Sequence, residues 1–213
     1  MRSEPRWPVA LTILAVLALL ILLPDRVRLF PPWSLVVMSL AMLGCLAGAA
    51  THPQSRGWAR IEQWTIYGFV ALAGAGTLAM LRELIYDMIR RSNVLDGLHL
   101  LTSSIAIWAL NVTMFSLLYW QLDRGGPLGR ELAHRHRDWI FPQDQAAPED
   151  LPPDWRPQFI DYLFLGYSTA TAFSTTDAQP LTGRAKFAMM CESTISLVTL
   201  VVVAARAINV LGS

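Results

Sequence analysis

Apolar residues dominate long uncharged runs that are separated by short polar turns. Four runs contain no Asp, Glu, Lys or Arg and a fifth contains two such residues; the runs are 9–23, 34–50, 65–81, 102–122 and 187–213. A helix needs about 20 apolar residues to cross the roughly 30 Å hydrocarbon core of a bilayer. Indole rings favour the headgroup level, and four tryptophans lie near run ends: Trp7, Trp33, Trp64 and Trp120. The pattern predicts an all-α, polytopic membrane helix bundle with five spanning helices.

The organisation changes after the fourth run, where prolines and a His-Arg repeat predict an aqueous loop with little regular structure. The stretch that follows, 159–173, is apolar but only about 15 residues long, which is too short to cross a bilayer. It leads into a polar turn and then a full-length helix, the pattern of a re-entrant hairpin. Non-helical backbone at membrane depth requires protein or a water-filled cavity around it.

We therefore predict two parts of the chain. Residues 1–97 form three amino-terminal helices with an amphipathic extension. Residues 98–213 form a pore-like module with helix 98–122, loop 123–158, hairpin 159–184 and final helix 185–212.

Composition narrows the class of partner. The chain is 54% hydrophobic and 15% charged, whereas soluble domains carry about 25% charged residues. Its formal net charge of +1 gives no electrostatic reason to expect nucleic acid as a partner. Cys45 and Cys191 both fall inside apolar runs, so no disulfide is expected. His134 and His136 have no third ligand at a recognisable spacing. We expect no metal, no cofactor and no catalytic residues.

A polar stripe follows one face of the final helix. Its positions recur at helical steps of four, three, four and three residues and hold Glu192, Ser196, Thr199, Val203 and Arg206, of which all but Val203 are polar. Ionisable groups inside spans usually face the bundle interior or a water path, so these residues are predicted to line a pore. The other interpretation is that the hydroxyls of this helix join helices to one another and that Glu192 hydrogen-bonds locally.

The segment before this helix reads YSTATAFSTTDAQPLTGRAK from Tyr167 to Lys186. It resembles the pore loop of potassium channels, because four residues match that pattern in type and spacing: Thr169, Thr171, Asp177 and Pro180. The filter positions of the family are held here by Phe173, Ser174, Thr175 and Thr176. The resemblance implies a homo-oligomer, predicted to be a tetramer, that passes monovalent cations.

Both filter glycines of the family are absent from this segment. Glycine supplies the positive φ that a column of backbone carbonyls requires, so a potassium-selective filter is not expected. A constriction lined by hydroxyls and a ring of Asp177 carboxylates favours cations with weak selectivity.

A wider set of motifs, including Tyr-Trp-Gln-Leu-Asp-Arg-Gly-Gly-Pro at 119–127, resembles a group of uncharacterised bacterial integral membrane proteins. This resemblance implies a multi-pass protein of the bacterial inner membrane. A non-conducting membrane scaffold or a small-solute transporter is the alternative function. The channel analogy and the positive-inside rule predict opposite orientations, so the orientation stays open.

Overall fold

The computed structural model describes residues 4–22, 32–52, 54–90, 97–132, 136–152, 155–172 and 178–211. The described chain is mostly helical, which confirms the all-α class. The long helices are α1 (Trp7–Leu22), α2 (Pro32–Thr51), α3 (Arg56–Arg90), α4 (Gly97–Leu122), α6 (Phe159–Ala172) and α7 (Gly183–Leu211). The short elements are η1 (Asp123–Gly125), α5 (Pro127–Leu132), β1 (Trp139–Ile140), η2 (Pro142–Gln145), η3 (Pro148–Asp150) and β2 (Gln179–Pro180).

Three segments of the described chain are long and apolar enough to cross a membrane. They are Arg56–Glu83, Ser103–Leu132 and Gly183–Val202. Shorter apolar stretches occur in α1 and α2, at Trp7–Leu19 and Val36–Thr51. The helix α3 continues without interruption to Arg90, as the amphipathic extension of the third run predicts. These lengths are compatible with a membrane protein.

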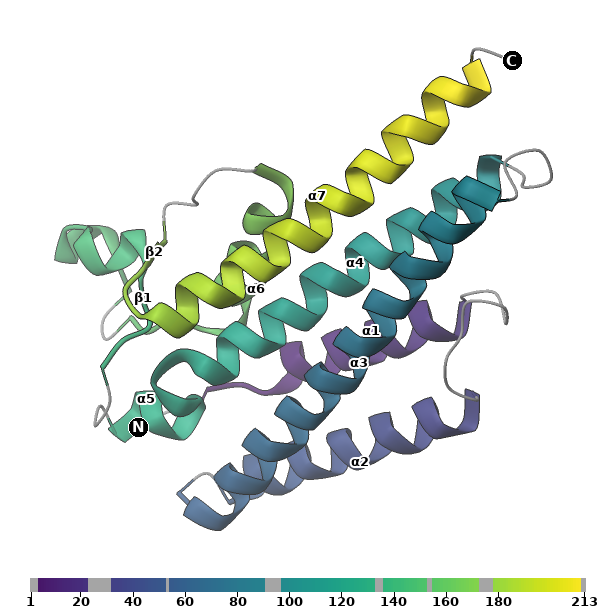
Figure 1. Ribbon diagram of the computed structural model, residues 1–213. Helices are drawn as coiled ribbons and strands as arrows, with labels where there is room; N and C mark the ends of the chain where they lie inside the picture. Colours follow the sequence, from purple (N-terminus) through teal and green to yellow (C-terminus); the bar gives the residue numbers. More distant parts are fainter. Residues whose placement is uncertain are drawn as a thin grey trace.

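Helix α4 is the centre of the molecule. It packs against α1 and α3 on one side and against α6 and α7 on the other (Figure 1), while α2 reaches the bundle through α1 and α3. Its side chains Ile107, Leu117 and Trp120 are buried in one continuous apolar core. Because α4 touches both halves of the bundle, polar groups on its α6–α7 side lie deep inside the molecule.

The stretch predicted as an irregular aqueous loop, 123–158, is in its described part ordered at one end of the bundle, with some residues buried and others, such as 144–147, exposed. It holds short helices and a strand, and its Asp123, Arg130 and Trp139 are buried. Prolines begin several of these elements, because proline is pre-set for the first helical position. The composition of the segment indicates a loop, but contacts to residues far away in the sequence give it order.

A sharp reversal follows α4. Arg124, Gly125 and Gly126 have φ angles of 54°, 81° and 88°, a region that glycine adopts without steric cost. The residue before a proline avoids the helical region, and Gly126 precedes Pro127, which begins α5. The turn therefore ends α4 and folds α5 back onto the bundle.

The strands β1 and β2 form a two-residue antiparallel pair. Trp139 lies opposite Pro180 and Ile140 lies opposite Gln179. This pairing joins the segment after α5 to the segment before α7, so the start of α7 is held at the end of the bundle where α4 finishes.

Candidate functional site

Glu192 lies at the contact between α4, α6 and α7. It is 0% exposed, and its Oε2 accepts a hydrogen bond from the hydroxyl of Tyr119 on α4. Its other carboxylate oxygen, Oε1, has no hydrogen-bond partner in the described part of the chain. An acidic side chain inside an apolar helix bundle is energetically costly and usually functional, so Glu192 is the first candidate for chemistry.

Further polar groups surround this carboxylate along the seam between the helices. On α4, the Asn111 Nδ2 donates to the backbone oxygen of Glu192 at 3.1 Å and to the Ser196 Oγ at 2.8 Å. From α7, the Ser193 Oγ donates to the backbone oxygen of Thr169 on α6 at 3.3 Å. We call the buried set the seam cluster; its members are Asn111, Ser116, Tyr119, Thr169, Glu192 and Ser196.

Gly166 lets α6 approach this cluster. A Cβ at this position would lie 2.5 Å from the Ser116 Oγ and 3.3 Å from the Glu192 Oε1. No side chain fits at 2.5 Å from another heavy atom, so glycine is required for this packing. The two oxygens therefore border the same small space beside the Gly166 backbone.

The predicted pore-lining stripe faces the interior of a single chain. Glu192, Ser196 and Thr199 are 0%, 2% and 2% exposed, and the first two contact α4 directly. Arg206 belongs to α7, but its side chain is outside the described set. A pore on an axis between copies would therefore be lined by a face other than this stripe in the conformation described.

The filter-like residues are divided between two environments. Thr169 is buried and its Oγ1 has no hydrogen-bond partner among the described residues. Thr171 is exposed, and its hydroxyl donates to the Tyr167 backbone oxygen at 2.8 Å. The remaining predicted residues, Phe173, Ser174, Thr175, Thr176 and Asp177, lie outside the described residues.

A second buried polar group lies where α4 ends. Arg130 on α5 donates to the Glu4 carboxylate at 2.7 Å and to the Trp120 backbone oxygen at 2.6 Å. Its guanidinium lies 5.1 Å from the centre of the Tyr162 ring, and Tyr162 donates to Asp123 at 2.6 Å. We call this group the cap cluster; its members are Glu4, Asp123, Arg130, Asp138, Tyr162 and Arg184.

Asp138 connects the cap cluster to α7. Its carboxylate accepts hydrogen bonds from Arg184 at 2.6 and 2.7 Å and from Thr182 at 2.6 Å. Burial raises the pKa of Asp138, but the bonds from Arg184 and Thr182 outweigh burial and hold this pKa below its ordinary value. The backbone oxygen of Asp138 also accepts from the Leu181 N–H, so the start of α7 is tied to the segment after α5.

Trp139 separates the cap cluster from the seam cluster. It is 1% exposed, and its ring centroid is 5.1 Å from that of Tyr119. Its indole N–H lies 3.3 Å from the Met189 sulfur on α7. The indole therefore packs against Tyr119 of the seam cluster and Met189 of α7, next in sequence to Asp138 of the cap cluster.

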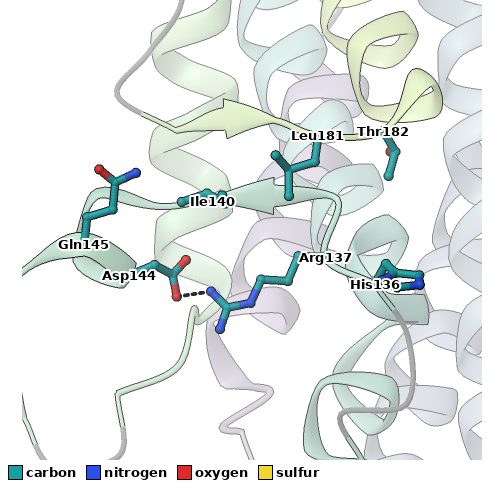
Figure 2. Close-up of a pocket in the computed structure, with 7 residues that line it drawn as sticks. All are labelled: His136, Arg137, Ile140, Asp144, Gln145, Leu181 and Thr182. Carbon is teal, nitrogen blue, oxygen red and sulfur yellow. Dashed lines mark hydrogen bonds and ion pairs between the residues drawn. The ribbon is translucent and has the colours of Figure 1, made fainter.

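An open groove borders the β1–β2 pair. Figure 2 shows Arg137 and Asp144 joined by an ion pair within it, and the other lining residues are His136, Ile140, Gln145, Leu181 and Thr182. None of these residues belongs to the seam cluster. His134, the second histidine of this region, lies outside the described residues.

Sequence reasoning identified Glu192 and Ser196 but did not assign roles to Tyr119, Gly166 or Asp138. Tyr119 and Gly166 carry no local signal, because their importance comes from contacts 73 residues away and from helix packing. The acidic residues Asp123 and Asp138, in an otherwise apolar or basic context, are the one signal that a buried polar group exists at the end of α4. Comparison with models of protein families, with curated proteins and with solved structures finds no match.

Proposed function

We propose that the chain is a multi-pass membrane protein that conducts small monovalent cations through its α4–α6–α7 unit. The single observation that carries the proposal is the fully buried carboxyl of Glu192 inside an apolar, span-length helix. Such residues in membrane helices mark ion pathways and proton relays. The bacterial inner membrane is the location that the sequence motifs favour.

The proposed topology has five spanning helices, α1, α2, α3, α4 and α7, with α6 as a re-entrant half-helix. Fourteen residues of α6 make a helix about 21 Å long, shorter than the hydrocarbon core. Ala178 lines the same small cavity as Asp161 and Leu165 on α6, and β2 pairs with β1. This return of the chain towards the end where α6 begins supports the re-entrant arrangement.

The proposed constriction is the segment 173–177, with the hydroxyls before Asp177 and the Asp177 carboxylate attracting cations. A homo-oligomer, with four copies as the first expectation, would bring these segments together. Apolar side chains on the outer faces of α6 and α7, such as Phe164 and Phe187, are exposed and suit either lipid or a neighbouring copy.

A non-conducting scaffold or a small-solute transporter is the second candidate. The observation that favours it is the burial of the Glu192 stripe within one chain, because a polar site enclosed by α4, α6 and α7 needs no second copy. A stable monomer in native-like lipid would support this candidate over an oligomeric pore.

Cation flux into liposomes containing the purified full chain tests the proposal. We expect flux of potassium and sodium above that of protein-free liposomes, and a loss of flux in Asp177→Asn. The matched control is Asp150→Asn, the same substitution at an exposed residue of η3, which leaves the flux unchanged. Absence of any cation flux from folded protein would overturn the proposal.

Labelling tests the topology separately. Gln158 and Gln179 are exposed and flank the proposed hairpin. In a chain whose two native cysteines are replaced by alanine, Gln158→Cys and Gln179→Cys should react with a membrane-impermeant maleimide from the same side. Reaction from opposite sides would show that the segment crosses the membrane.

A further inference from the structure

Glu192 differs from every other buried acidic side chain in the described residues. Glu62 accepts from Arg6 through both of its oxygens. Asp123 accepts from the Asp138 N–H and the Tyr162 hydroxyl, and both oxygens of Asp138 receive donors. Glu192 alone among these retains an oxygen with no hydrogen-bond partner in the described part of the chain.

The position of this unpartnered oxygen suits a proton. The Tyr119 hydroxyl already donates to Oε2, so a proton bound at Oε1 displaces no existing hydrogen bond. The Ser116 hydroxyl borders the same space beside Gly166. The Ser116 hydroxyl donates its hydrogen bond to the Val112 backbone oxygen at 2.7 Å, so its oxygen lone pairs remain available to accept a hydrogen bond.

The surroundings contain few other groups that titrate. Tyr119 faces Glu192 from α4, Cys191 is its neighbour on α7, and α6 presents Gly166 and Thr169, which do not titrate. Trp139 contacts Met189, three residues before Glu192 on α7, whereas the Asn111 amide contacts Ser196, four residues after it. Hydroxyl and amide groups therefore extend along the seam on the side of Glu192 away from Trp139.

We propose that Glu192 is a proton-binding site within the bundle, with Tyr119 as its hydrogen-bonding partner, and that the proton is one of the monovalent cations that this chain moves. The second part rests on the proposed function and adds the proton to the cations it names. In this arrangement the proton is bound at Oε1, beside Ser116 and Gly166, and is released towards the polar side chains of the seam. Trp139 limits access from the cap cluster.

Carbodiimide labelling of the full chain in lipid tests the site. Dicyclohexylcarbodiimide enters apolar regions and forms a stable adduct with protonated carboxyl groups. Mass spectrometry over a pH series should find the adduct on Glu192 and no adduct on Glu62, the buried carboxyl paired with Arg6. A protein that is unlabelled at Glu192 across the series overturns the proposal. Wild-type protein is sufficient here, so the result does not depend on a variant that folds.

Proton flux tests the use of the site. In liposomes containing a pH-sensitive dye, we expect proton flux that the carbodiimide abolishes, and its loss in Glu192→Gln. The control Glu83→Gln, at a residue outside the site, retains the flux. If cation flux is present but proton flux is unchanged both by the carbodiimide and by Glu192→Gln, the inference is overturned and the proposed function stays intact. Labelled Glu192 without flux of any ion overturns the proposed function and supports the proton-binding site alone.

Discussion

The cap cluster and the seam cluster differ in how completely the oxygens of their buried carboxylates are hydrogen-bonded. In the cap cluster, the carboxylates of Glu4, Asp123 and Asp138 each receive hydrogen bonds on both oxygens. In the seam cluster, Glu192 receives one hydrogen bond from Tyr119 and has a second oxygen without a described partner. A carboxylate with both oxygens hydrogen-bonded stabilises one arrangement, whereas an incompletely paired carboxyl has capacity for a ligand or a proton. This contrast is the reason for treating the cap cluster as structural and Glu192 as the proposed functional residue.

Arg130→Met should produce the largest effect. The Arg130 side chain is 4% exposed, and its guanidinium donates hydrogen bonds to the Glu4 carboxylate and to the Trp120 backbone oxygen. Its removal leaves the Glu4 carboxylate without its cation, and breaking a buried pair costs about 3–5 kcal/mol. We expect a sharp fall in folded protein, measured by circular dichroism during heating in detergent.

The control for this substitution is Arg82→Met. The Arg82–Glu83 pair is exposed, with 82% of the arginine side chain accessible, and such pairs contribute about 0–1 kcal/mol. Similar melting behaviour of the two variants would show that the cap cluster does not hold the fold.

Gly166→Ala should come second. The new methyl would lie 2.5 Å from the Ser116 Oγ, and overpacking of this kind costs about 1–3 kcal/mol. We expect a lower melting temperature and a displaced α6. Gly68→Ala on α3 is the matched control, because a Cβ there meets no atom within 4 Å. Equal stability of the two variants would contradict the close approach of α6 to the seam.

The sequence was sufficient for the helices but insufficient for these two clusters. Uncharged runs predict α3, α4 and α7 well, because a run of apolar residues can be recognised within a short window of sequence. The contacts of Arg130 with Glu4 and of Glu192 with Tyr119 join residues 126 and 73 positions apart. No spacing rule connects residues at such distances, so the sequence alone predicts an irregular loop for 123–158, the segment that supplies Asp123, Arg130 and Asp138 to the cap cluster.

The polar stripe on α7 illustrates the same limit. Its helical spacing correctly places Glu192, Ser196 and Thr199 on one buried face. The spacing cannot show whether this face borders a pore or another helix, because polar groups in membrane helices avoid lipid in both cases. The contacts with α4 supply this missing information.

Asp138→Asn should have an intermediate effect that depends on pH. The variant loses the charge that holds Arg184, whose side chain is half exposed, so we expect a cost of about 1 kcal/mol at neutral pH. The folded pKa of Asp138 lies below its ordinary value, so its contribution is present above the ordinary aspartate pKa and is lost as the pH falls through the folded pKa. The difference in melting temperature between wild type and variant should therefore narrow in acid. A difference that is constant with pH would show that the ionised carboxylate does not stabilise the cap.

Glu192→Gln should have the smallest effect on stability. It is therefore the clearest test of the difference between the cap cluster and the seam cluster. Glutamine keeps an acceptor for Tyr119 and can direct its amide towards the space beside Ser116, so we expect a change within about 1 kcal/mol. The matched change in the cap cluster, Asp123→Asn, directs an amide at one of two donors and should cost about 1–3 kcal/mol. Thermal unfolding of the two variants in the same detergent measures the difference. An equal loss in both would mean that Glu192 is as fully engaged in the fold as Asp123, and the division between a cap that holds the structure and a seam that binds a proton would fail.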